Sequence, residues 1–97
     1  MPYELRLSPG TQAAIKTYVR ERFKKGQHAT AVDAIYDALK KLAESPHTVR
    51  QPYWAVRPFY VFTIKLDDGV TRPIRVTFRY DEDEKGILIL EFAPQQM

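Results

Sequence analysis

Three consecutive segments decide the fold of this chain: Pro58-Phe-Tyr-Val-Phe-Thr-Ile-Lys-Leu66, Thr71-Arg-Pro-Ile-Arg-Val-Thr-Phe-Arg-Tyr80 and Gly86-Ile-Leu-Ile-Leu-Glu-Phe92. All three are rich in β-branched and aromatic residues, which favour strands. Asp67-Asp-Gly69 joins the first two and is a tight-turn signal, because glycine tolerates positive φ. A charged loop at Asp81–Gly86 joins the last two. Joints this short force antiparallel neighbours, so the segments predict a three-stranded meander.

Alternation along these strands predicts two different sheet faces. The predicted core face takes the heavier apolar set of each strand: Tyr60, Phe62, Ile64 and Leu66; Ile74, Val76, Phe78 and Tyr80; and Leu88, Leu90 and Phe92. Ile87, Ile89 and Glu91 then fall on the other face. That second face also carries three basic residues: Lys65, Arg75 and Arg79.

A short strand and two helices are expected before the meander. Tyr3–Leu7 alternates like a strand, and Ser8-Pro9 is a good start for a helix that runs to about Lys25. Thr30 and Asp33 resemble a capping box that starts a second helix, which Ser45-Pro46 ends. Residues 47–57 are interpreted as a linker.

The predicted fold class is therefore α+β, in two layers and in the order β–α–α–β–β–β. Two amphipathic helices cover one face of a mainly antiparallel four-stranded sheet, and the first strand pairs with an open edge of the meander. The residues expected to be buried are Ile35, Leu39, Leu42, Phe62, Ile64, Val76, Phe78, Leu88 and Leu90.

Length and composition predict one domain over residues 1–97. The chain has no cysteine, which excludes a disulfide scaffold and thiolate chemistry and fits a reducing cytoplasm. No secretory pattern opens the chain and no apolar run approaches membrane length, so a cytoplasmic protein without membrane contact is expected. The net charge of +3 mildly favours an anionic partner.

No metal site and no cofactor is predicted. The two histidines, His28 and His47, stand far apart without acidic residues at ligand spacing, and Asp81–Glu84 does not match a calcium-binding loop. The cationic sheet face has two interpretations. Polar residues on an open face keep a sheet soluble, whereas arginines fixed on a strand bind phosphate bidentately and stabilise developing negative charge.

Several phrases resemble one family of toxins. Leu5-Arg-Leu-Ser-Pro9 is similar to its opening strand and first helix cap, and Asp33-Ala-Ile-Tyr-Asp-Ala-Leu-Lys-Lys-Leu-Ala-Glu-Ser-Pro46 to its second helix. Arg75-Val-Thr-Phe-Arg-Tyr-Asp-Glu-Asp83 resembles its central strand and turn, and Ile87–Phe92 the strand after it. Together they resemble the RelE/ParE superfamily of type II toxin–antitoxin toxins over nearly the whole chain.

The resemblance implies growth inhibition and neutralisation by a cognate antitoxin protein. The mechanism expected first is the RelE-like one, and the ParE-like one is the alternative. A RelE-like toxin cleaves mRNA on the ribosome without a metal. On that model the catalytic set is Arg75 on the phosphate, Lys65 on the preceding strand and Arg79 as their neighbour. A ParE-like toxin inhibits DNA gyrase without nuclease activity. Residues 93–97 hold none of the Arg, His or Tyr that family nucleases usually place after the last strand, which favours weak cleavage or the ParE-like alternative.

A third alternative rests on the first half of the chain. Gly26-Gln-His-Ala-Thr-Ala-Val-Asp33 resembles a phrase of ribbon–helix–helix antitoxins, which bind DNA as dimers. Glu4 and Arg6 would then read the major groove from a two-stranded ribbon. This interpretation leaves the three C-terminal strands unexplained and ranks third.

Overall fold

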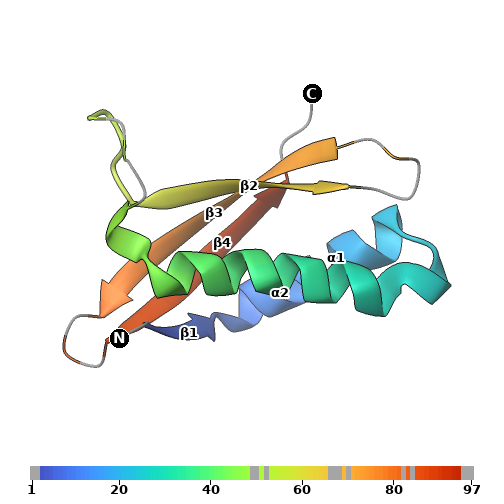
Figure 1. Ribbon diagram of the computed structural model, residues 1–97, viewed down its shortest axis with the longest axis horizontal. Helices are drawn as coiled ribbons and strands as arrows, with labels where there is room; N and C mark the ends of the chain where they lie inside the picture. Colours follow the sequence, from blue (N-terminus) through green and yellow to red (C-terminus); the bar gives the residue numbers. More distant parts are fainter. Residues whose placement is uncertain are drawn as a thin grey trace.

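The computed structural model describes residues 3–48, 51, 53–65, 69, 71–81, 83 and 85–94. Figure 1 shows two helices on one face of a single sheet, and no helix or strand of the described residues covers the other face. The elements follow in the order β1 (Glu4–Leu7), α1 (Pro9–Arg22), α2 (His28–Glu44), β2 (Phe59–Lys65), β3 (Thr71–Asp81) and β4 (Gly86–Pro94). The predicted two-layer α+β architecture is confirmed.

The sheet has the order β1-β4-β3-β2, in which β2, β3 and β4 form the predicted antiparallel meander. Gly69 has the expected positive φ of 85° at the first joint, whereas Asp67 and Asp68 lie outside the described residues. β1 adds to the edge of β4 in parallel, because the two helices return the chain to the starting end of the sheet. The ribbon–helix–helix alternative needs β1 to pair with another chain, and here β1 pairs within its own sheet.

The start of α1 follows its sequence signal. The Ser8 side chain accepts a hydrogen bond from the Thr11 backbone N–H at 3.2 Å, and Pro9 occupies the first turn. This arrangement satisfies a backbone donor that the helix itself leaves without a partner. The helix ends at Arg22, three residues before the predicted end, where Phe23 turns to an extended conformation.

The predicted capping box of α2 is wrong. A short 3₁₀ turn at Lys25–Gln27 leads directly into the helix, which begins at His28. Thr30 therefore lies inside the first turn, and the capping position is Gln27, which makes no side-chain capping bond. The 3₁₀ turn continues into the helix without the extended residue that a capping box requires. The end of α2 at Glu44, just before Pro46, agrees with the predicted stop.

The core lies between the helices and the meander, and β4 enters it differently from the prediction. Ile87 and Ile89 are completely buried, whereas Leu88 and Leu90 are half-buried. A bulge interrupts the β3–β4 ladder: Phe78 pairs with Ile89 and Thr77 with Glu91, so Leu90 has no partner on β3. One extra residue reverses the alternation, and Phe92 returns to the core face.

The other predicted core residues are buried as expected. The set comprises Ile35, Leu39, Leu42, Phe62, Ile64, Val76 and Phe78. Ile15, Tyr18 and Val19 complete the core from α1. No helix within the described ranges is both long and apolar enough to span a membrane.

Candidate binding face of the sheet

The face of the sheet that points away from the helices is called the open face below. Arg75, Thr77 and Arg79 of β3 belong to it, because they alternate with buried residues of the core. Phe59, Val61, Thr63 and Lys65 of β2 alternate in the same way with Phe62 and Ile64. The predicted cationic face therefore exists as a surface.

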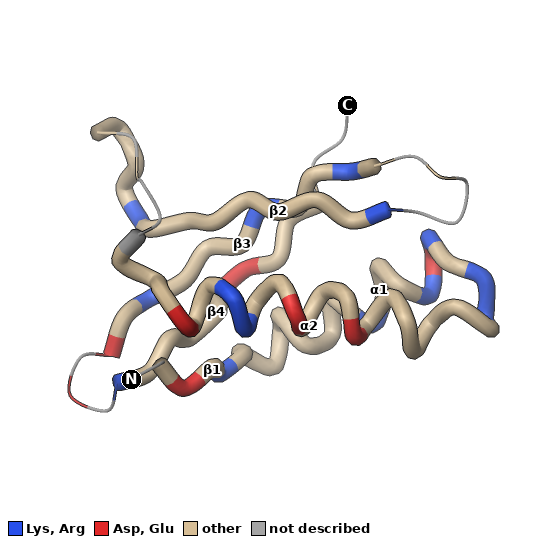
Figure 2. Tube along the Cα trace, in the orientation of Figure 1, with Lys and Arg blue, Asp and Glu red and all other residues tan. Residues whose placement is uncertain are grey.

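The three basic residues predicted to form one site are spread along this face. Arg75 and Arg79 are four residues apart on β3, which corresponds to about 13 Å. Lys65 pairs with Thr71, so Lys65 and Arg79 stand about 27 Å apart along the sheet. Figure 2 shows the basic positions distributed along β3 and at the end of β2. Lys65 and Arg79 cannot both reach one phosphate, and the catalytic role of each residue stays a prediction.

Arg75 is the member with the most developed surroundings. Its guanidinium carbon lies 4.3 Å from the centre of the Phe59 ring, an arrangement in which the cation interacts with the ring face. Val61, which is 47% exposed, pairs with Arg75 across the ladder. Arg75 forms no ion pair within the part of the chain that the structure describes. Its N–H groups can therefore bind an anion while the ring holds the guanidinium in place.

Trp54 extends this stack from the loop before β2. Its ring centre lies 6.2 Å from that of Phe59, and the two ring planes differ by 26°. Trp54 is 61% exposed, so part of its ring surface remains open to solvent. Phe59 thus contacts both Arg75 and Trp54, and we call these three side chains the aromatic platform.

The loop that carries Trp54 is closed by Gln51. The Gln51 side-chain amide donates to the Phe59 carbonyl at 2.8 Å, and the Phe59 backbone N–H donates to Gln51 Oε1 at 2.9 Å. One side chain thus makes both hydrogen bonds that a further strand residue would make at the start of β2. This bridge joins the two ends of the loop that carries Trp54.

Gln51→Ala is expected to release this loop. Loss of two half-buried hydrogen bonds should lower the free energy of unfolding by about 1–2 kcal/mol, and Trp54, the one tryptophan in the sequence, should change its emission. Gln12→Ala is the matched control, because Gln12 makes one exposed bond to the Leu7 carbonyl. Urea titration and the emission maximum measure both effects. An unchanged Trp54 emission in Gln51→Ala would contradict the role of the bridge.

A hollow of about 430 Å³ opens beside the platform. Trp54 and Arg57 of the loop line it together with Arg75, Thr77 and Glu91 from β3 and β4. Arg57 also borders a second hollow, of about 540 Å³, that reaches Arg79. The hollows therefore supply cationic, aromatic and hydrogen-bonding groups within one region of the open face.

Sequence reasoning missed the platform because it interpreted residues 47–57 as a linker. Phe59 already falls on the outward set of the alternation, and Tyr53-Trp54 between two prolines is unusually aromatic for a linker. Those two signals together could have indicated an exposed aromatic surface. The bridge from Gln51 to Phe59 closes the loop that carries Trp54, and no local pattern predicts this bridge.

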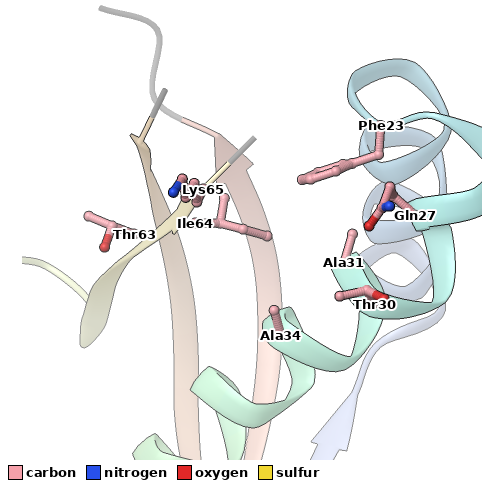
Figure 3. A pocket seen from close by; sticks show the side chains of 8 residues that line it. All are labelled: Phe23, Gln27, Thr30, Ala31, Ala34, Thr63, Ile64 and Lys65. Carbon is pink, nitrogen blue, oxygen red and sulfur yellow. The ribbon is translucent and has the colours of Figure 1, made fainter. Parts of the chain in front are cut away.

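A separate groove lies on the helix side, at the edge of β2. Phe23, Ala31, Ala34 and Ile64 line this groove of about 310 Å³, which Lys65 borders at the strand end. Figure 3 shows Phe23 and Ile64 pointing toward each other across it, while Thr63 points away from the helices. In the described sheet β2 has β3 on one side only, so the groove runs beside an edge strand.

Both histidines have structural contacts. His28 Nε2 lies 2.9 Å from the Phe23 carbonyl oxygen. His47 Nε2 lies 2.8 Å from the Tyr3 hydroxyl, and its ring stacks on Tyr80 with centres 4.7 Å apart. Among the described residues, no three metal-ligating side chains gather into a site. The histidines fix the ends of α1 and α2 rather than forming part of the open face.

Comparison with known proteins gives one assignment. No curated protein and no solved structure matches significantly. A family model described as "ParE toxin of type II toxin-antitoxin system, parDE" matches residues 11–97. The match covers well over half of the chain: it takes in α2, the whole meander and all of α1 except its first two residues. The chain therefore belongs to the ParE toxin family of type II toxin–antitoxin systems.

Proposed function

We propose that this toxin acts as a gyrase inhibitor and not as a ribosome-dependent nuclease. The observation that carries the proposal is the match to the ParE family over residues 11–97. The family also implies a cognate antitoxin, whose binding keeps the toxin inactive.

Two features of the chain support the choice between the mechanisms. The spread of Lys65, Arg75 and Arg79 along the sheet does not concentrate positive charge on one phosphate, as a metal-independent cleavage site would require. In addition, the five residues that follow Phe92 in the sequence, 93–97, contain no Arg, His or Tyr. Both features make mRNA cleavage the weaker interpretation.

The antitoxin has two surfaces of different chemistry to cover. The open face carries Arg57, Arg75 and Arg79, which an acidic segment would neutralise. The groove lined by Phe23 and Ile64 offers apolar contacts beside the edge of β2. A segment that crosses both surfaces would need an acidic part and an apolar part.

The two mechanisms are separated by parallel assays of one purified protein. We expect the toxin to reduce supercoiling by purified gyrase in a dose-dependent manner and to produce no new mRNA ends on translating ribosomes. Arg75→Ala provides the comparison, because a RelE-like site would lose roughly a hundredfold or more in cleavage rate without this charge. Strong ribosomal cleavage by the wild type, together with intact gyrase activity, would overturn the proposal.

A further inference from the structure

We infer that the aromatic platform and its hollow bind a short single strand of nucleic acid, with one base stacked on Trp54 and the adjacent phosphate held by arginine. This inference goes beyond the proposed function, because gyrase inhibition does not require the toxin itself to contact nucleic acid.

The stack ends in an open aromatic surface. Arg75 lies over Phe59, and Phe59 stacks on Trp54, a residue that is 61% exposed. Any nucleobase has a flat π-face, so a stacked base would continue the series regardless of its sequence. The bridge between Gln51 and Phe59 closes the loop, which reduces the freedom that the loop would lose when a base binds.

The hollow supplies the groups that the rest of a nucleotide needs. Arg57 and Arg75 border it and can bind a phosphate, and neither forms an ion pair within the described residues. Glu91 lies among the same lining residues and would repel a phosphate. Its carboxylate instead suits the exocyclic amino group of a base. The arginines of the hollow therefore match the phosphate of a nucleotide, and the glutamate matches the amino group of its base.

An unpaired strand fits this surface better than a duplex or an acidic protein segment. In a duplex the base faces are already stacked and are not accessible to Trp54. An acidic peptide would satisfy the arginines but would leave the aromatic surface unused and would meet Glu91. DNA and RNA share the chemistry recognised here, so both belong in the test.

The test titrates the wild-type toxin with twelve-nucleotide oligo(dC) and oligo(rC). Base stacking should quench the fluorescence of Trp54, which is the single tryptophan of the chain. Whichever strand quenches more strongly identifies the nucleic acid. Absence of quenching by both at low salt would overturn the inference. Equal quenching by a duplex of the same length, or by polyglutamate, would also overturn it, because the surface would then recognise negative charge alone.

Variants assign the two roles, using a labelled oligonucleotide and its anisotropy. Trp54→Ala should weaken binding about tenfold or more, while Trp54→Phe retains most of it.

Arg75→Ala should reduce the slope of log affinity against log salt by about 0.7, the value of one phosphate contact with a single strand. Arg20→Ala removes the same charge from an exposed position on α1, and it should leave the slope unchanged. Equal slopes for the two arginine variants would contradict the assignment. The gyrase assay does not depend on oligonucleotide binding. A negative result in the binding experiments can therefore be distinguished from a failure of the proposed gyrase inhibition.

Discussion

Phe78→Ala is expected to lower the free energy of unfolding by about 3–5 kcal/mol. The Phe78 side chain is 1% exposed and lies at the centre of the core face of β3. Its ring packs edge-to-face on Tyr80 at 5.3 Å between centres, so truncation removes an aromatic contact and leaves a cavity. Small domains have only about 5–15 kcal/mol of stability in total, so this variant should unfold at much lower urea concentration.

Arg79→Ala is the matched control for Phe78→Ala. The two residues are neighbours on one strand but point to opposite faces, and Arg79 is exposed. Its truncation should change the free energy of unfolding by no more than about 0.5 kcal/mol. Urea titration followed by circular dichroism measures both variants. Similar losses in the two would show that β3 does not present one face to the core and the other to solvent.

The sequence predicted β3 well because its alternation is a local property. Each buried residue of this strand stands next to a polar one, so one choice of face accounts for Ile74 through Tyr80. In β4 every residue from Ile87 to Leu90 is aliphatic, and both faces are equally apolar by composition. The choice there depends on the bulge, which is a property of the β3–β4 pair and not of β4 alone.

The same distinction explains what could be predicted of the candidate site. Alternation placed Arg75 and Arg79 on the open face because both belong to one regular strand. The distance between Lys65 and these two arginines depends on the register of the β2–β3 hairpin. The composition of the strands does not determine that register. The contribution of Trp54 depends on a side-chain bridge from Gln51 to Phe59, eight residues away. Local patterns therefore predict which residues lie on the open face. The contacts that those residues make are set by the tertiary structure.

Ile89 and Leu90 give the sharpest test of the bulge, because strict alternation and the observed register predict opposite orders of stability. Ile89 is completely buried, and its carbonyl also accepts hydrogen bonds from the Ser8 backbone N–H and the Thr11 hydroxyl, both at 3.1 Å. Because the side chain is completely buried, Ile89→Ala should lower the free energy of unfolding by about 2–5 kcal/mol, while the bonds to the backbone carbonyl remain.

Leu90→Ala removes a half-buried side chain of almost the same size from the neighbouring position, where β3 offers no pairing partner. Since complete burial of such a side chain contributes about 1.5–3 kcal/mol, half-burial should make this loss about 1 kcal/mol. Both variants keep the strand apolar and differ only in the face from which methyl groups are removed. Urea titration of the pair should consequently give the lower midpoint for Ile89→Ala. A lower midpoint for Leu90→Ala would contradict the bulge. It would indicate that β4 alternates regularly and places Leu88 and Leu90 in the core.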